Sequence, residues 1–150
     1  MPFRKTENSA KPLVIIPCGG AKRDYPCLAA LMYVGGYHLK CQAYAEELTT
    51  LDRILILSAK YGLLALDDPI EPYELRMGKP GCVSWSVVHH QAVERGLAGE
   101  LGSNVIALGG SAYTGVCKRV WPGCRTPLDG VGGIGKQLAW MKARIAEHER

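Results

Sequence analysis

Short continuous apolar runs alternate along this chain with longer stretches in which apolar residues recur at helical spacing. Buried strands are predicted at 13–16, 53–57 and 104–108, and a short strand or extended segment at 126–128. Helices are predicted over 37–50, 84–101 and 136–147, with another that Ser111 caps and that ends at Val120. Continuous apolar strands separated by helices are typical of parallel sheets. The pattern predicts an α/β protein, a three-layer α/β/α sandwich with a mostly parallel sheet of about four strands.

The remaining segments predict how the chain is organised. Residues 1–11 are polar and mixed in charge, which predicts a flexible N-terminal arm without the apolar core of a signal peptide. Residues 12–150 have the length of a single α/β domain. Residues 67–80 hold three prolines and a glycine and predict an irregular loop. No apolar run reaches the ~18 residues of a membrane span, so we expect no membrane partner.

The cysteine and histidine spacing indicates the compartment and the metal chemistry. None of the six cysteines forms a Cys-x-x-Cys pair, and the four histidines lack zinc-site spacing. We therefore expect reduced thiols in a cytoplasmic protein, with no metal and no cofactor. The net charge of +4 is mild, and it allows an anionic ligand such as a nucleotide without requiring DNA or RNA. A homodimer through exposed apolar helix surface is compatible with the sequence.

Small, flexible residues follow each of the three main predicted strands. These are Pro17-Cys18-Gly19-Gly20, Ser58-Ala59-Lys60 and Gly109-Gly110-Ser111. In an open parallel sheet these loops lie at one edge, where ligands of α/β proteins bind. Glycines there let a ligand approach the backbone and expose amide groups to an anion. The sequence therefore predicts a ligand pocket at this edge.

Two glycine-rich stretches are candidates for binding a phosphate. Cys18, Gly19 and Gly20 precede Lys22, although the spacing is not that of a Walker A loop. Cys18 itself is a candidate pocket-wall residue rather than a nucleophile. Gly133, Gly135 and Lys136 stand at the start of the last predicted helix, where free amides and the helix dipole favour an anion. The alternative for this second stretch is a flexible connection.

The stretch from Ser58 to Glu74 carries the densest side-chain chemistry. Asp68, Glu71 and Lys60 are the candidate catalytic residues, because cleaving a glycosidic bond needs a carboxylate that stabilises positive charge or activates water. The carboxylates could equally bind ribose hydroxyls or belong to a turn. Candidate substrate-binding residues here are Ser58, Ala59, Tyr61, Gly62 and Tyr73. The tyrosines could stack on a base or be half-buried structural residues.

Together these residues resemble a known family. The matching segments are Leu13–Cys18 with Lys22, Tyr33-x-Gly35, Ala43-Tyr44-Ala45, Ile56–Leu63, Ile70–Tyr73 and Gly133–Leu138. They resemble a family of small phage and bacterial proteins catalogued as a domain of unknown function. The Ser-Ala-Lys-Tyr-Gly-Leu block is similar to one in the peroxide-stress DNA-binding protein family. Pro17–Lys22 resembles the Pro-Cys-Ser-x-x-Lys signature of archaeosine synthases, with Gly19 in place of the serine.

The resemblance implies an α/β fold similar to uracil-DNA glycosylases and some handling of nucleotides, nucleobases or nucleic acid. We expect an enzyme that hydrolyses or exchanges the N-glycosidic bond of a nucleotide or of a base in nucleic acid. The alternative is a non-catalytic module that senses a nucleotide or binds DNA or RNA, for example in phage–host conflict. A deoxyribosyltransferase-like hydrolase of free nucleotides is a third expectation.

Overall fold

The computed structural model describes residues 11–148, and its centre is a four-stranded sheet. The strands stand in the order β4 (Gly62–Ala65), β3 (Ile54–Ser58), β1 (Leu13–Pro17) and β6 (Val105–Ala107). β1 pairs in parallel with β3 and with β6, whereas β4 runs antiparallel to β3. Every residue of β1, β3 and β6 is buried, as their continuous apolar character predicts. Most of the predicted arm, residues 1–10, lies outside the described residues.

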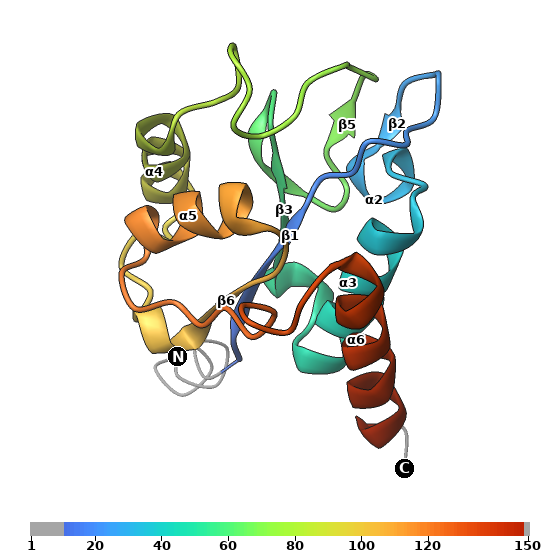
Figure 1. The fold of residues 1–150 in the computed structure, drawn as a ribbon. Coiled ribbons are helices and arrows are strands. Elements are labelled where there is room, and N and C mark those ends of the chain that lie inside the picture. Colours follow the sequence, from blue (N-terminus) through green and yellow to red (C-terminus); the bar gives the residue numbers. More distant parts are fainter. Residues whose placement is uncertain (1–10, 149–150) are drawn as a thin grey trace.

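Helices cover both faces of this sheet. The longer helices are α3 (Gly36–Leu48), α4 (Trp85–Glu94), α5 (Ser111–Val120) and α6 (Ile134–His148). The short elements are α2 (Ala29–Met32), the 3-10 turns η1 (Leu51–Arg53) and η2 (Gly102–Asn104), and a small sheet of β2 (Cys27–Leu28) with β5 (Pro69–Ile70). Figure 1 shows α4 and α5 on one side of the sheet and α3 with α6 on the other. The predicted three-layer α/β/α class is confirmed.

The last helix docks on α3 rather than directly on the sheet (Figure 1). The rings of Tyr44 on α3 and Trp140 on α6 meet edge to face, with centroids 5.6 Å apart. Met141 on the same face of α6 is fully buried. Aromatic pairs of this geometry add stabilisation beyond the area that they bury. This contact fixes the position of the α6 N-terminus.

The fourth strand of the sheet is not where the sequence pattern predicts it. The expected segment, 126–128, adds no strand, and only the neighbouring Arg125 makes an isolated bridge with Ile106. The fourth strand is β4, which follows β3 through a tight turn. A hairpin strand of four residues has no periodicity long enough to separate it from a loop. The Ser58–Leu64 block therefore forms a β-hairpin.

Several predicted boundaries also shift. The helix predicted over 84–101 ends at Glu94, because Gly96 has a φ of +73° and the Leu97 amide donates to the Ala92 carbonyl. Part of the predicted 67–80 loop pairs as β5 with β2, where Pro69 is tolerated because the strand is an edge.

The starts of the last two helices move as well. The cap of α5 is Gly110, which has the extended backbone of a capping position, and Ser111 is the first helical residue. The last helix begins at Ile134 rather than at Lys136.

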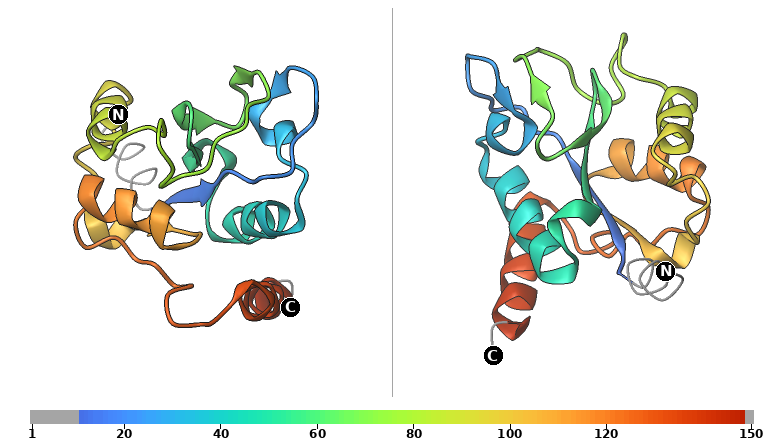
Figure 2. Two further views of the ribbon diagram at one scale, coloured as in Figure 1. Left: turned by 45° about the horizontal axis from the view of Figure 1, so that its top comes forward. Right: turned by 180° about the vertical axis from the view of Figure 1, so that it is seen from behind.

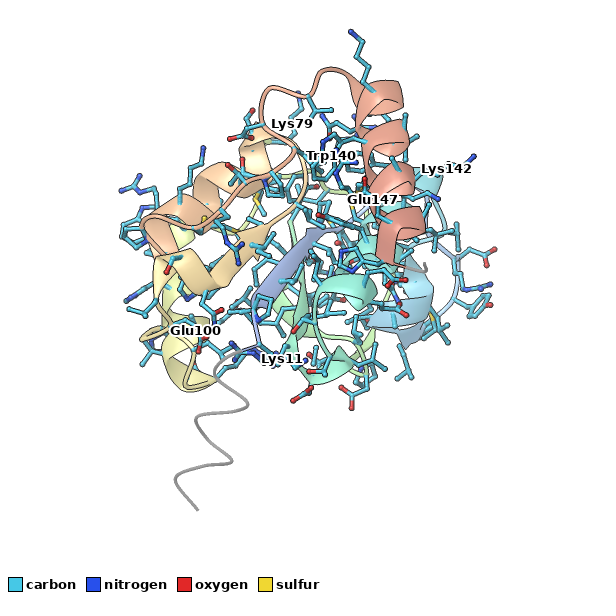
Figure 3. All side chains as sticks on the ribbon, turned by 90° about the horizontal axis from the view of Figure 1, so that it is seen from below. Lys11, Lys79, Glu100, Trp140, Lys142 and Glu147 are labelled. Atoms are coloured by element: carbon cyan, nitrogen blue, oxygen red, sulfur yellow. The ribbon has the colours of Figure 1, made fainter. Side chains whose placement is uncertain are left out.

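The end of the sheet at which β1 begins is closed by polar contacts. Arg53 donates to the Lys11 carbonyl at 2.9 Å and pairs with the Glu100 carboxylate. The Asn104 amide donates to the same Lys11 carbonyl at 3.1 Å. Figure 3 views the molecule from this end, with Lys11 and Glu100 labelled. These contacts leave the opposite end of the strands for a ligand.

Gln91 of α4 holds the β3–β4 hairpin through its backbone. Its side-chain amide donates to the Tyr61 carbonyl at 2.9 Å, and its side-chain oxygen accepts from the Leu63 amide at 2.8 Å. Gly62 lies between them with a φ of +80°, and a Cβ added there would stand 2.1 Å from the Gln91 Oε1 atom. The turn therefore requires glycine both for its backbone conformation and for space.

We predict that Gly62→Ala destabilises the protein by about 2 kcal/mol or more, from backbone strain and displacement of Gln91. Urea unfolding at constant slope measures the loss. Gly115→Ala is the control, because Gly115 lies inside α5 with nothing within 4 Å of an added Cβ. It should gain up to about 1 kcal/mol from helix propensity. Equal effects of the two substitutions would contradict this account of the hairpin.

Candidate anion-binding cavity

A cavity of about 360 Å³ opens where β1 ends, at the edge that the sequence predicts. Its floor is the segment Pro17-Cys18-Gly19-Gly20, which continues β1 past the sheet. Figure 2 (left) looks toward this edge, with α5 and α3 flanking the end of β1. We call this space the cavity below. Because it lies beyond the carboxyl ends of parallel strands, it occupies the usual position of a ligand site in an open α/β sheet.

The N-termini of three helices meet at the cavity. Gly35 and Gly110, the capping residues of α3 and α5, line it, as does Ile134, the first residue of α6. Neither α3 nor α5 has a side chain bonded to its first amide groups. The first turn of a helix leaves its amide hydrogens without helical acceptors, and the helix dipole adds partial positive charge there. Three such ends around one space make it a favourable place for an anion.

The charge of the described cavity lining also favours an anion. Arg76, on the loop between β5 and α4, lines the wall and is exposed. Its guanidinium makes no ion pair with the other described residues. No aspartate or glutamate is among the described lining residues. Among the described residues, the field in the cavity therefore combines the charge of Arg76 with the partial positive charge of three helix N-termini.

The remaining wall is aromatic and apolar. Tyr37 on α3 donates to the Gln137 side-chain oxygen on α6 at 2.5 Å, which ties the two helix starts together. Tyr113 on α5 lies opposite, with its hydroxyl 3.2 Å from the Cys18 sulfur. Leu75 and Ile134 complete this surface. Such a mixture of apolar wall and few polar groups is typical of small-molecule sites.

His38 is the one buried imidazole of the described chain, and it lines the cavity from the first turn of α3. Its Nδ1 lies 2.8 Å from the Pro17 carbonyl oxygen, so Nδ1 carries the hydrogen of that bond. Its Nε2 is buried without a hydrogen-bond partner. Burial lowers the pKa of His38, and the Pro17 carbonyl and the nearby Gln42 amide oppose this only in part. His38 is therefore neutral at pH 7.

A chain of buried hydroxyl groups lies behind the cavity floor. Ser58 donates to the Tyr73 hydroxyl at 2.7 Å, and that hydroxyl lies 2.7 Å from the Tyr33 hydroxyl. Burial raises the pKa of Tyr33 to about 12, and burial likewise raises the pKa of Tyr73. The Ser58 oxygen also accepts from the amides of Lys60 and Tyr61. Both tyrosines are neutral hydrogen-bonding groups that hold the β3–β4 turn against the loops around the floor.

The structure brings together only part of the predicted site. Cys18, Gly19, Gly20 and Gly110 line the cavity. Gly109 packs against Pro17 of the floor, and Ser111 is the first residue of α5. Around the start of α6 lie Gly133, Gly135 and Lys136, and none of these five residues lines the cavity. Lys22 and Tyr73 line a neighbouring hollow instead. Five predicted residues belong to the hairpin: Ser58, Ala59, Lys60, Tyr61 and Gly62.

The predicted carboxylates lie outside the cavity. Asp68 accepts from the Ala65 amide at 2.8 Å and pairs with Arg95 at 3.2 Å, so it shapes the β4–β5 turn. Glu71 is exposed, and its backbone amide contacts the Tyr61 hydroxyl at 3.3 Å. The catalytic roles expected for these residues stay predictions.

Sequence reasoning missed the five described side chains of the cavity wall that can form hydrogen bonds, besides the apolar Leu75 and Ile134. They are Tyr37, His38, Arg76, Tyr113 and Gln137. Four of them lie in the first turns of helices, where a sequence pattern shows a helix but not what its N-terminus faces. The only usable signal is that glycines precede these helices where capping residues are usual.

Comparison with known proteins gives one match. A model for a family of unknown function, DUF6884, matches residues 13–143. The chain belongs to this family. The match spans the whole sheet, the cavity and most of α6, so these are features of a DUF6884 domain. Neither the curated proteins nor the solved structures contain a match to the chain.

Residues 11–148 contain no group of three or more histidine, cysteine, aspartate or glutamate side chains placed to hold a metal ion. No helix in the same range has the length and apolar character needed to cross a membrane.

His38 predicts how stability depends on pH. Because its folded pKa lies below the ordinary 6.5, the unfolded chain takes up this proton more readily. The stability present above pH 6.5 should therefore be lost as the pH falls below that value and through the folded pKa. Melting temperatures at pH 7.5 and 5.5 measure this loss. His38→Asn, which can still donate to Pro17, should lose less on acidification, whereas His89→Asn, at an exposed site, should match the wild type. If His38→Asn loses as much melting temperature between pH 7.5 and 5.5 as the wild type does, His38 is not the source of the pH dependence.

Proposed function

We propose that this DUF6884 protein binds a nucleotide in the cavity, with the phosphate at the three helix N-termini. The observation that carries the proposal is the convergence of these three ends, two of which, those of α3 and α5, begin at glycines without side-chain caps. Free amide groups at helix N-termini bind phosphate in several α/β folds. Arg76 supports this, because a guanidinium matches the geometry of phosphate oxygens.

The rest of the cavity suits the nucleoside part of such a ligand. Tyr37 and Tyr113 offer aromatic surface against which a base can pack, and Leu75 adds apolar contact. The Cys18 thiol and the Gln137 side-chain amide are polar groups of the lining residues. The volume of about 360 Å³ lies at the small end of ligand pockets, which favours one nucleotide unit over a larger cofactor.

The carboxylates distinguish two versions of this function, an N-glycosidic enzyme and a non-catalytic nucleotide-binding module. Hydrolysis of a glycosidic bond normally uses carboxylates beside the sugar. None is among the described residues that line the cavity, and Asp68 is already engaged by Ala65 and Arg95. We therefore place binding first and hydrolysis second.

The proposal predicts which ligands bind. A thermal-shift screen should show that nucleoside 5′-monophosphates raise the melting temperature more than nucleosides or free bases do, since only the former carry the phosphate.

Gly110→Asp is the decisive variant. The backbone at Gly110 already has a capping conformation, and nothing lies within 4 Å of an added Cβ. The new carboxylate should occupy the α5 amides, stabilise the free protein by about 0.5 kcal/mol and weaken monophosphate binding at least tenfold.

Opposite signs for stability and affinity separate loss of the site from damage to the fold. Gly110→Asn is the matched control, because it offers a cap without a negative charge and should lose less affinity. Monophosphate binding that survives Gly110→Asp unchanged would rule out a phosphate at this helix end. A screen without any nucleotide hit would rule out the proposed function.

The double variant Asp68→Asn, Glu71→Gln tests the enzyme version. Both carboxylates lie outside the cavity lining, so we expect monophosphate affinity within about twofold of the wild type. Incubation of the best ligand with wild type and variant, followed by mass spectrometry for a released base, gives the second readout. Base release by the wild type that the variant loses would assign these carboxylates to catalysis. Equal release would remove them from the mechanism.

A further inference from the structure

A second hollow of about 430 Å³ adjoins the cavity and shares Gly20 with it. It is lined by Lys22, Arg23, Asp24, Tyr73 and Glu74, on the loops that follow β1 and β5. Gly20 is exposed, and because it has no side chain it does not separate the cavity from the hollow. A ligand can therefore continue from the cavity across Gly20 into this hollow.

Two cations flank the crossing point. The Arg76 Nη2 atom lies 3.7 Å from the position that a Cβ on Gly20 would take. On the other side, the Lys22 Nζ lies 3.4 Å from the Gly20 carbonyl oxygen. Neither side chain makes an ion pair with a carboxylate between residues 11 and 148. Two unpaired cations beside an exposed glycine favour a negative group at that point.

The rings of Tyr33 and Tyr73 hold the Lys22 side chain in place. Its Nζ lies 4.4 Å from the centre of the Tyr73 ring and 5.9 Å from that of Tyr33. Both rings are fixed by the buried hydroxyl chain with Ser58. Cation–π contact with fixed rings orders a lysine that would otherwise lose rotamer entropy on binding. Lys22 is thus positioned before a ligand arrives.

We propose that the ligand is a dinucleotide unit of a polynucleotide, whose linking phosphate lies over Gly20 between Arg76 and Lys22. This inference rests on the proposed function, because the first phosphate is the one at the helix N-termini. The second nucleoside occupies the hollow beyond Gly20. A nucleoside di- or triphosphate would also supply a second phosphate, but it would bring further charge toward Asp24 and Glu74. Sugar hydroxyls are better partners for these carboxylates, because a carboxylate accepts hydrogen bonds.

The experiment compares three ligands that carry the same base: the nucleoside 5′-monophosphate, its 5′-diphosphate and the 5′-phosphorylated dinucleotide. Titration calorimetry of the full chain at several salt concentrations gives each affinity. The wild type should bind the dinucleotide at least tenfold more tightly than the monophosphate, from added charge-assisted hydrogen bonds. Its salt dependence should be steeper by about 0.7 in the logarithmic slope, as expected for one more phosphate of a single strand. The diphosphate should gain less.

Lys22→Gln separates this inference from the proposed function. It should remove most of the dinucleotide gain and the extra salt slope while leaving monophosphate affinity within about twofold, and Lys22→Arg should restore part of the gain. Lys142→Gln, at an exposed site on α6, is the matched control and should behave as wild type.

Monophosphate binding without a dinucleotide gain, or a gain that Lys22→Gln leaves intact, would overturn the inference alone. A larger gain for the diphosphate would overturn it in favour of a polyphosphate ligand. Failure of every nucleotide to bind would overturn the proposed function and this inference together.

Discussion

The site depends on how closely the backbone packs where β1 and β6 end. Gly109 has a φ of +118°, and a Cβ there would stand 3.0 Å from the Pro17 side chain. The Pro17 carbonyl oxygen in turn accepts a hydrogen bond from His38 at the start of α3. Only glycine allows the chain leaving β6 to turn this close to β1. The same turn sets the start of α5 beside the cavity floor, while His38 holds the start of α3 on the other side.

The N-termini of α3 and α5 lack the stabilisation that a side-chain cap would give them. A serine, threonine or aspartate cap would satisfy amide groups that Gly35 and Gly110 leave open, for a gain of a few tenths of a kcal/mol each over glycine. The neighbouring helix α4 has such a cap, because the Ser84 side chain accepts from the Val87 amide. Open helix ends occur where the cavity lies, which is the pattern expected when a ligand supplies the missing acceptors. The buried chain of Ser58, Tyr73 and Tyr33 gives the surrounding loops a fixed base.

The sequence predicts the layers well and the site only in outline. Continuous apolar runs identify β1, β3 and β6, and the glycines after β1 and β6 mark the correct edge of the sheet. The strand β4 is missed because its pairing depends on Gln91, which reaches the hairpin from a helix about 30 residues further along the chain. His38, Arg76 and Tyr113 are missed for a similar reason, since helix starts and loops from distant segments meet at the cavity. A local pattern carries no information about such meetings.

The Ser58–Leu64 block shows why dense chemistry in a sequence need not mark a reactive site. Ser58 bonds to two amides of its own turn, and Gly62 is required by the position of Gln91. Asp68 is held by Ala65 and Arg95. Each of these residue types has a structural reason for its place in the hairpin or the turn after it. Gly20 differs from these residues, because it is exposed and the two side chains beside it, Arg76 and Lys22, are cations without an ion pair to another described residue. Residues whose chemistry the fold does not use are the stronger indication of a ligand, and in this protein they lie around Gly20 and the three helix ends.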